Sequence, residues 1–249
     1  MRLLFSKLAL ASALGFASFA QPVTAKPLGA VRTVSPKGDA LEVRTRDNEL
    51  VTIQLYRDDI VRVRAGANGK LEDAGDGAAK IVSAQAVAQP DWKLSETPEY
   101  HLVQTGKFSL RIYKDALRLE GWDAANSKMI WRELTPIDLS ADRNVETISS
   151  APNEQFYGGG MQNGHITFKG KLMEIGYSGG WEEDDTPNPA PFFLSTAGYG
   201  VLRNSWKDGS YDFRSDDYLV AEHKEGRFDS FYIFGDTPAA LVGGYTALT

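Results

Sequence analysis

The sequence predicts an all-β fold, a β-sandwich with one short helix near its C-terminal end. Three observations indicate this fold: apolar and polar residues alternate from Leu41 onward, turn-forming residues separate the alternating runs, and a single capped helical segment follows them. Because successive side chains of a strand face opposite sides of a sheet, such alternation is typical of half-buried antiparallel strands. Many strands with one terminal helix favour a β-sandwich.

The strand pattern can be followed along the chain. Alternating runs occupy residues 41–45, 51–56, 61–65, 108–112 and 117–119. Turn signals separate them at residues 47–48, 67–69 and 114–115, and residues 123–128 predict the loop of a further hairpin between the runs 117–122 and 129–134. The Ala- and Gly-rich segment 72–88 predicts a long loop with a short strand near Ile81.

The predicted helix lies at the end of this strand-rich region. Thr237 is a suitable N-cap, and Pro238 suits the first helical turn. Leu241, Tyr245 and Leu248 would share one face of the helix.

The composition limits the partners and the chemistry. The chain has 249 residues, of which 42% are hydrophobic, so it can bury a substantial core. Its 27 basic and 33 acidic residues give a net charge of −6, which opposes nucleic-acid binding because that binding relies on excess Lys and Arg. The sequence contains no cysteine, which excludes disulfides, thiol chemistry and cysteine metal sites.

The first 25 residues predict an export signal. Arg2 and Lys7 are positive, residues 8–20 are apolar and small, and cleavage after Ala20 or Ala25 would satisfy the small-x-small rule. A buried N-terminal helix is the alternative interpretation. The apolar run is too short to span a bilayer, and no later stretch is apolar enough. We therefore expect a periplasmic or secreted protein without a membrane span.

Two glycine-containing patterns do not support the chemistry they suggest. Residues 176–180 match the nucleophile-elbow string, but that motif needs a turn from strand into helix, and residues 181–189 have the character of a loop. Residues 158–160 are three glycines that lack the further glycine of a dinucleotide fingerprint. They predict a flexible turn, and no cofactor is expected.

The three histidines, His101, His165 and His223, are far apart and show no metal-ligand spacing. No metal site is therefore expected. An aldose mutarotase would need only one histidine and one carboxylate around a sugar ring, and that alternative stays open.

An acidic run, Glu182 to Asp185, follows Trp181 and precedes three prolines between residues 187 and 191. A solvated acidic loop is the commoner meaning of such a run. The functional interpretation is a sugar site, in which the indole stacks on the sugar face and the carboxylates accept hydrogen bonds from its hydroxyl groups. The residue pattern alone leaves both interpretations open.

Residues 154–160, Glu-Gln-Phe-Tyr-Gly-Gly-Gly, resemble the E-x-F-Y-G-x-G segment of glycoside hydrolase family 31. Further blocks resemble the same family in the same order, at residues 130–133, 191–201, 210–213 and 228–249. The resemblance covers the chain from about Leu41 onward and is specific from Glu154. Residues 158–164 and 168–171 look most like bacterial members that include α-galactosidases and α-glucan-active enzymes.

This resemblance implies a galactose-mutarotase-like β-sandwich over residues 26–235, after a signal peptide at 1–25. Residues 236–249 would then begin the connection to a (β/α)8 barrel. Members of the family carry two barrel aspartates as nucleophile and acid/base of a retaining mechanism. The sequence stops at Thr249, where the barrel would begin, so we expect no catalytic residue in these 249 residues and no activity from them alone.

The resemblance also implies a site. In the family a sandwich loop leans over the barrel mouth and shapes a sugar subsite, and residues 181–190 match it by position. We therefore expect Trp181, Asp184 and Asp185 to bind substrate. The expected partners are a carbohydrate and the protein's own C-terminal barrel, with no nucleic acid.

The expected function is that of the N-terminal domain of an exported retaining α-glycosidase, similar to α-glucosidases or α-galactosidases, that acts on oligo- or polysaccharides. Two alternatives remain. One is a stand-alone carbohydrate-binding or structural module, and the other is an aldose mutarotase-like enzyme.

Overall fold

The computed structural model describes residues 26–66, 69–71, 81–82 and 90–249, and it confirms the all-β sandwich with one C-terminal helix. The strands form three sheets of eight, six and five strands, in which every pairing is antiparallel. The predicted signal peptide, the predicted turn at residues 67–68 and most of the predicted 72–88 loop lie outside the described residues.

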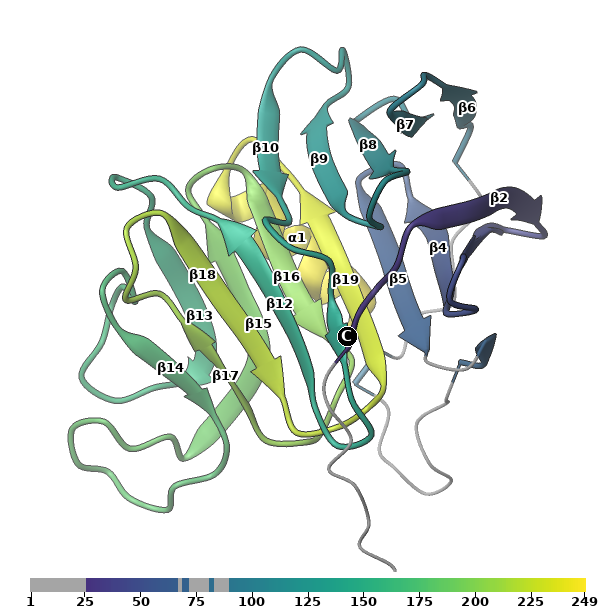
Figure 1. The fold of residues 1–249 in the computed structure, drawn as a ribbon. Coiled ribbons are helices and arrows are strands. Elements are labelled where there is room, and N and C mark those ends of the chain that lie inside the picture. Colours follow the sequence, from purple (N-terminus) through teal and green to yellow (C-terminus); the bar gives the residue numbers. More distant parts are fainter. Residues whose placement is uncertain (1–25, 67–68, 72–80, 83–89) are drawn as a thin grey trace, which may run out of the picture.

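The eight-stranded sheet is the central layer of the molecule (Figure 1). In spatial order its strands are β13 (Phe156–Met161), β15 (Asn188–Ser195), β16 (Tyr199–Arg203), β19 (Phe228–Phe234), β5 (Ile60–Gly66), β4 (Leu50–Arg57), β3 (Ala40–Thr45) and β2 (Val31–Lys37). The sequence alternation predicted three of these strands, β3, β4 and β5, because their buried residues recur with period two.

The two smaller sheets cover one face of the central sheet (Figure 1). The six-stranded sheet comprises β1 (Lys26–Pro27), β11 (Asp138–Leu139), β12 (Asn144–Ser149), β18 (Tyr218–His223), β17 (Gly209–Asp212) and β14 (Leu172–Ile175). The five-stranded sheet comprises β10 (Met129–Arg132), β9 (Leu119–Asp123), β8 (Phe108–Tyr113), β7 (Tyr100–Gln104) and β6 (Lys93–Glu96). The predicted hairpin at residues 117–134 is thus confirmed as β9 and β10.

Aromatic stacks join the layers. Phe156 of the central sheet stacks on Phe213 at 4.2 Å between ring centroids, beside the six-stranded sheet. On the other side, Phe234 stacks on Phe108 of the five-stranded sheet, also at 4.2 Å. These rings belong to one continuous core that draws residues from all three sheets, and burial of such large apolar surfaces is the main stabilising term of a sandwich.

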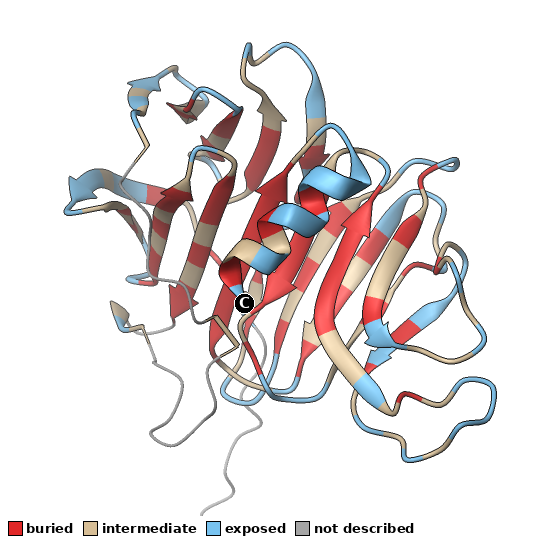
Figure 2. Cartoon of the chain, turned by 180° about the vertical axis from the view of Figure 1, so that it is seen from behind, coloured by how far each residue is buried: buried red, intermediate tan, exposed pale blue. Residues whose placement is uncertain are grey.

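Helix α1 (Pro238–Leu248) lies across the opposite face of the central sheet (Figure 2). The predicted cap is confirmed, since the hydroxyl oxygen of Thr237 accepts a hydrogen bond from the Ala240 amide. Leu241 and Leu248 are buried in a second core cluster that includes Ile233 of β19. Within the described residues, no helix has the length and apolarity needed to cross a membrane.

One sequence expectation is wrong, and another lies mostly outside the described residues. Residues 158–160 are not a flexible turn, because they lie inside β13, where the pairing register with β15 shifts between Gly158 and Gly160. Their φ angles of 126°, 78° and 75° suit glycine, and a Cβ on Gly160 would lie 2.3 Å from the Asn188 carbonyl oxygen. Around the short strand expected near Ile81, the structure describes only Ile81 and Val82, which are not in a strand and pack against the cluster beneath α1.

A buried polar cluster connects the three sheets. The Arg203 guanidinium, at the end of β16, donates to a carboxylate oxygen of Glu146 in β12 at 2.8 Å, and the Tyr232 hydroxyl of β19 donates to the other oxygen. Glu133, just beyond β10, accepts a hydrogen bond from the Leu119 amide at 2.8 Å. Burial and the adjacent Glu146 carboxylate raise the pKa of Glu133 well above its usual value. Burial also raises the pKa of Glu146, but the Arg203 charge and the Tyr232 hydroxyl oppose that shift. Of the two carboxyl groups, Glu133 therefore keeps a proton more readily, and Glu146 pairs with Arg203 at 2.8 Å.

Substitutions of Glu146 and of Glu133 should lower the free energy of unfolding by very different amounts. Glu146→Ala leaves the Arg203 charge buried without its partner, so the free energy of unfolding should fall by about 3–5 kcal/mol. Glu133→Gln replaces the carboxyl group that burial biases toward its neutral form by an amide of the same shape, and the loss should stay within about 1 kcal/mol. Urea denaturation of both variants measures the difference, and equal losses would contradict the assigned charge states.

His223 is a second buried titratable group. Neither of its ring nitrogens has a hydrogen-bond partner among the described residues. Burial, reinforced by the nearby Arg203 charge, lowers the pKa of His223 from 6.5 to about 3. Since the folded imidazole resists protonation, the unfolded chain binds a proton that the folded chain does not, between these two pH values.

Stability should consequently fall as the pH decreases from about 6.5 toward 3, and the His223 contribution should be fully present above pH 6.5. His223→Phe removes the titrating group and keeps an aromatic ring beside Tyr211. Between pH 7 and pH 4 the variant should lose about 3 kcal/mol less stability than the parent chain. Parallel denaturation curves at both pH values test this, and an identical acid loss in the two proteins would disprove it.

Candidate functional site

The candidate site lies in the long connection between β13 and β15, residues 162–187. This connection has two arms on either side of β14, the edge strand of the six-stranded sheet. The first arm begins directly after the glycine-rich bulge of β13, where the Gln162 amide donates to the carbonyl oxygens of Gly159 and Glu174 at 2.9 and 3.0 Å. The bulge therefore sets where the connection leaves the central sheet.

Backbone hydrogen bonds join the two arms. The Asn163 amide donates to the Asp185 carbonyl at 3.1 Å, and the Asp184 amide donates to the Asn163 carbonyl at 3.4 Å. The Asn163 side chain adds a bond to the Glu182 carbonyl at 3.1 Å. Asp184 adopts a φ of 70°, a left-handed conformation that Asp tolerates better than most residues. The acidic run thus folds back onto the first arm.

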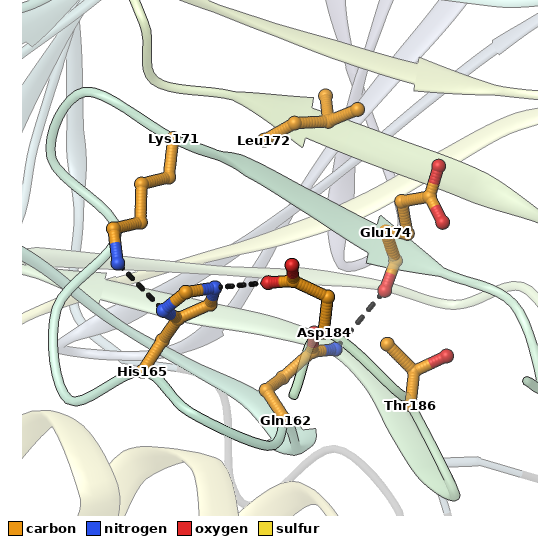
Figure 3. Close-up of a pocket in the computed structure, with 7 residues that line it drawn as sticks. All are labelled: Gln162, His165, Lys171, Leu172, Glu174, Asp184 and Thr186. Carbon is orange, nitrogen blue, oxygen red and sulfur yellow. Dashed lines mark hydrogen bonds and ion pairs between the residues drawn. The ribbon is translucent and has the colours of Figure 1, made fainter. Parts of the chain in front are cut away.

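A cavity of about 430 Å³ opens between the arms (Figure 3). It is lined by Gln162, His165, Lys171, Leu172, Glu174, Asp184 and Thr186. A volume in this range is typical of small-molecule sites, which combine apolar walls with a few oriented polar groups. The lining holds two carboxyl groups and one ammonium group, so hydrogen-bond acceptors and donors face the same space.

A chain of polar contacts orients one of these carboxylates (Figure 3). Lys171 Nζ lies 2.6 Å from His165 Nδ1, and His165 Nε2 lies 2.7 Å from Asp184 Oδ1. Because an ammonium group can only donate, Nδ1 accepts and Nε2 carries the proton that it donates to Asp184. The His165 side chain is 15% exposed and Asp184 is 77% exposed, so a packed ring holds a solvent-facing carboxylate.

The three predicted site residues have different places in this arrangement. Asp184 lines the cavity, and its Oδ2 makes no hydrogen bond within the described part of the chain. Trp181 is 80% exposed on the same loop and is not part of the lining. Asp185 turns toward its own loop, where it accepts hydrogen bonds from the Ser178 hydroxyl at 3.2 Å and the Glu182 amide at 2.9 Å.

Ser178 confirms that residues 176–180 are no nucleophile elbow. They form a loop after β14, and the chain continues from them as loop to the start of β15 at Asn188. The Ser178 hydroxyl donates to Asp185 and accepts a hydrogen bond from the Thr186 amide at 3.0 Å. It therefore closes the loop, and it does not lie on the sharp strand-to-helix turn that a nucleophile elbow needs.

The three histidines do not converge. His165 lines the cavity, His223 is buried in the sandwich, and His101 of β7 pairs with Glu96 at 3.5 Å. Across the described ranges, no three His, Asp or Glu side chains come close enough to hold a metal ion. The cavity groups suit hydrogen bonding to a polar ligand.

Sequence reasoning missed the groups that support Asp184. His165, Lys171 and Gln162 lie 13 to 22 residues before it, and only the fold of the two arms brings them to the same cavity. The one available signal was the resemblance of residues 158–164 and 168–171 to bacterial members of the family, a block that includes Gln162 and Lys171.

Comparison with known proteins identifies the fold. Residues 50–212 match the sequence profile of the glycosyl hydrolase 31 N-terminal galactose mutarotase-like domain. No curated protein sequence matches the chain.

Several solved structures are similar to this one. A dextranase of family 31 from Flavobacterium johnsoniae, in complex with isomaltotriose, has a TM-score of 0.82 and 21% identity over 90% of this chain. A cycloalternan-forming enzyme from Listeria monocytogenes gives 0.76 and 20% over 88%, and a family 31 α-xylosidase from a soil metagenome gives 0.73 and 21% over 88%. The chain spans 28%, 22% and 34% of these three proteins, respectively. At these identities the likeness shows the fold.

The loop geometry predicts that Asp185 is a support of the site. Asp185→Ala removes two hydrogen bonds that close residues 178–186, so exchange of the Glu182 amide with solvent should become about fivefold faster or more, as expected for a loss near 1 kcal/mol. Asp184→Asn is the matched control, because its side chain makes no bond to the loop backbone and Asn keeps the left-handed conformation. Equal exchange rates of the Glu182 amide in both variants, measured by NMR, would contradict the supporting role of Asp185.

Proposed function

The chain belongs to the family of glycosyl hydrolase 31 N-terminal galactose mutarotase-like domains, and from this premise we propose that it is the N-terminal domain of an exported retaining α-glycosidase. Its substrates are oligo- or polysaccharides, with α-glucoside and α-galactoside as the first candidates. The exported form lacks residues 1–20 or 1–25. The similar dextranase and α-xylosidase support a glycoside hydrolase context.

The observation that carries the proposal is the oriented Asp184 carboxylate at the open cavity. Its Oδ1 is held by His165 while Oδ2 stays available, so it can accept a hydrogen bond from a sugar hydroxyl without first losing rotational freedom. Trp181, exposed on the same loop, supplies a flat apolar surface for a sugar face. Asp185 contributes indirectly, by holding the loop that carries both residues.

In this proposal the domain binds and the barrel performs the hydrolysis. Retaining hydrolysis needs two carboxyl groups about 5 Å apart across the scissile bond, one as nucleophile and one as acid/base. We assign both to a (β/α)8 barrel that follows residues 236–249 in the longer protein. The 249-residue chain alone should release no p-nitrophenol from aryl α-glycosides.

A mutarotase is the second candidate, because His165, Asp184 and Glu174 line one cavity. Proton transfer to a sugar ring needs a histidine nitrogen that can reach the substrate. Both nitrogens of His165 are engaged, one by Lys171 and one by Asp184. This favours a positioning role for His165. Polarimetry with fresh α-D-glucose or α-D-galactose decides, since accelerated mutarotation by the purified chain would favour the mutarotase.

The reading frame beyond Thr249 separates the glycosidase from a stand-alone carbohydrate-binding module. A frame that encodes an eightfold alternation of strands and helices supports the enzyme. A stop codon at that point supports the module.

Substitutions in the longer enzyme test the site itself. Trp181→Ala and Asp184→Asn should each lower kcat/KM by about 5- to 150-fold, because each removes one substrate contact worth on the order of 1–3 kcal/mol, while measurable turnover persists. Glu183→Gln, an exposed change on the same loop outside the cavity lining, is the matched control and should stay near the parent value. Unchanged kcat/KM in both site variants would refute the role of this loop.

A further inference from the structure

A second cavity lies at the other side of the molecule, beside the five-stranded sheet. Its volume is about 390 Å³, and it is lined by Asp91, Trp92, Lys93, Gln104, Thr105, Gly106 and Ala124. Figure 1 places β6 and β7, which carry part of this lining, far from β14, which contributes Leu172 and Glu174 to the first cavity. The two cavities share no residue.

Trp92 gives this cavity an aromatic wall. The side chain is partly buried and packs against the main core while it also lines the cavity. An indole anchored in this way keeps a fixed orientation, so it can offer a flat surface to a ligand at little cost in side-chain entropy.

The polar groups around Trp92 are available to a ligand. The side chains of Asp91 and Lys93 form no hydrogen bond or ion pair with any described residue, and Gln104 makes only a long bond of 3.5 Å to the Ser109 hydroxyl. One carboxylate, one ammonium group and one amide give the cavity no net charge. It offers donors and acceptors to a neutral polar ligand but has no excess charge to hold an anion.

The remaining wall is rigid. The Thr105 hydroxyl donates to the Asp58 carbonyl at 2.8 Å and accepts hydrogen bonds from the Lys107 and Phe108 amides at 3.1 and 3.0 Å. Its hydrogen-bonding capacity is used by the turn, so Thr105 shapes the wall rather than contacting a ligand. A preformed wall lowers the cost of binding.

We propose that this cavity is a second saccharide-binding site, for a neutral sugar of one or two rings at the end of a longer glycan. Trp92 stacks on the sugar ring, and Asp91, Lys93 and Gln104 exchange hydrogen bonds with its hydroxyl groups. The volume is near the lower end of small-molecule sites, which suits a ligand of this size. The site holds a glycan at a distance from the Asp184 loop and does not depend on the role proposed for that loop.

The test follows the Trp92 indole N–H signal in ¹H–¹⁵N NMR spectra of the 249-residue chain, assigned with Trp92→Phe. Isomaltotriose and xylose, each at about 10 mM, are the probes, a concentration about ten times a millimolar Kd. At least one probe should shift the Trp92 signal in a saturable way. No shift with either probe would show a solvent-filled hollow and overturn the proposal.

Gly106→Phe is the blocking variant. Gly106 lines the cavity, its φ is not positive, and a Cβ there would meet no atom within 4 Å, so the new ring can enter the cavity without backbone strain. Lys107→Phe adds the same ring to the adjacent exposed position outside the lining. The first variant should weaken binding at least tenfold and the second should not.

Gln104→Ala is a second test that adds no bulk to the cavity. Loss of the Gln104 amide should weaken sugar binding severalfold. Binding that survives both Gly106→Phe and Gln104→Ala would overturn the proposal. Trp181→Ala and Asp184→Asn should leave the Trp92 shift unchanged. The proposal for the second cavity can therefore be refuted while the proposed role of the Asp184 loop is supported, and the reverse is also possible.

Discussion

The ion pair between Glu146 and Arg203 is the interaction on which the architecture depends. Arg203 ends β16 of the central sheet, and Glu146 lies in β12 of the six-stranded sheet. Glu133 brings the five-stranded sheet to the same point, through the Leu119 amide and a bridge to Ile148. Two charges removed from water are tolerated only when paired and hydrogen-bonded. The three sheets therefore meet at one buried polar point inside the apolar core.

Backbone constraints position the candidate site relative to the central sheet. The bulge at Gly158–Gly160 lets the backbone of β13 approach β15 closely and turns the chain toward the edge of the sandwich. The connection that follows returns beside β14, and its two arms hold each other through Asn163. A side chain at Gly160 would collide with the Asn188 carbonyl, so the same glycines that permit the strand pairing also determine where Asp184 is presented.

The sequence predicted what depends on local periodicity and missed what depends on contacts between distant segments. Strands β3 to β5 alternate because one face is buried, and the Thr237 cap is a local signal. β19 shows no alternation, since α1 covers the face opposite the core and all seven of its residues are buried. For the site, family resemblance pointed to the acidic run. It could not tell Asp184, which faces the cavity, from Asp185, which supports the loop, because that difference depends on the left-handed turn at Asp184.

The contacts of His165 indicate which chemical role the loop can have, proton transfer or the positioning of Asp184. A histidine that transfers protons to a substrate must bring one ring nitrogen within reach of the reacting group, whereas a histidine whose nitrogens both contact supporting side chains fixes geometry. His165 is of the second kind, because Lys171 sets its tautomer and that tautomer sets the orientation of Asp184. A carboxylate fixed before the ligand arrives loses less entropy on binding. The second cavity has the same advantage, because the hydrogen bonds of the Thr105 turn are formed before any ligand binds. Both ends of the sandwich therefore present preformed polar surfaces.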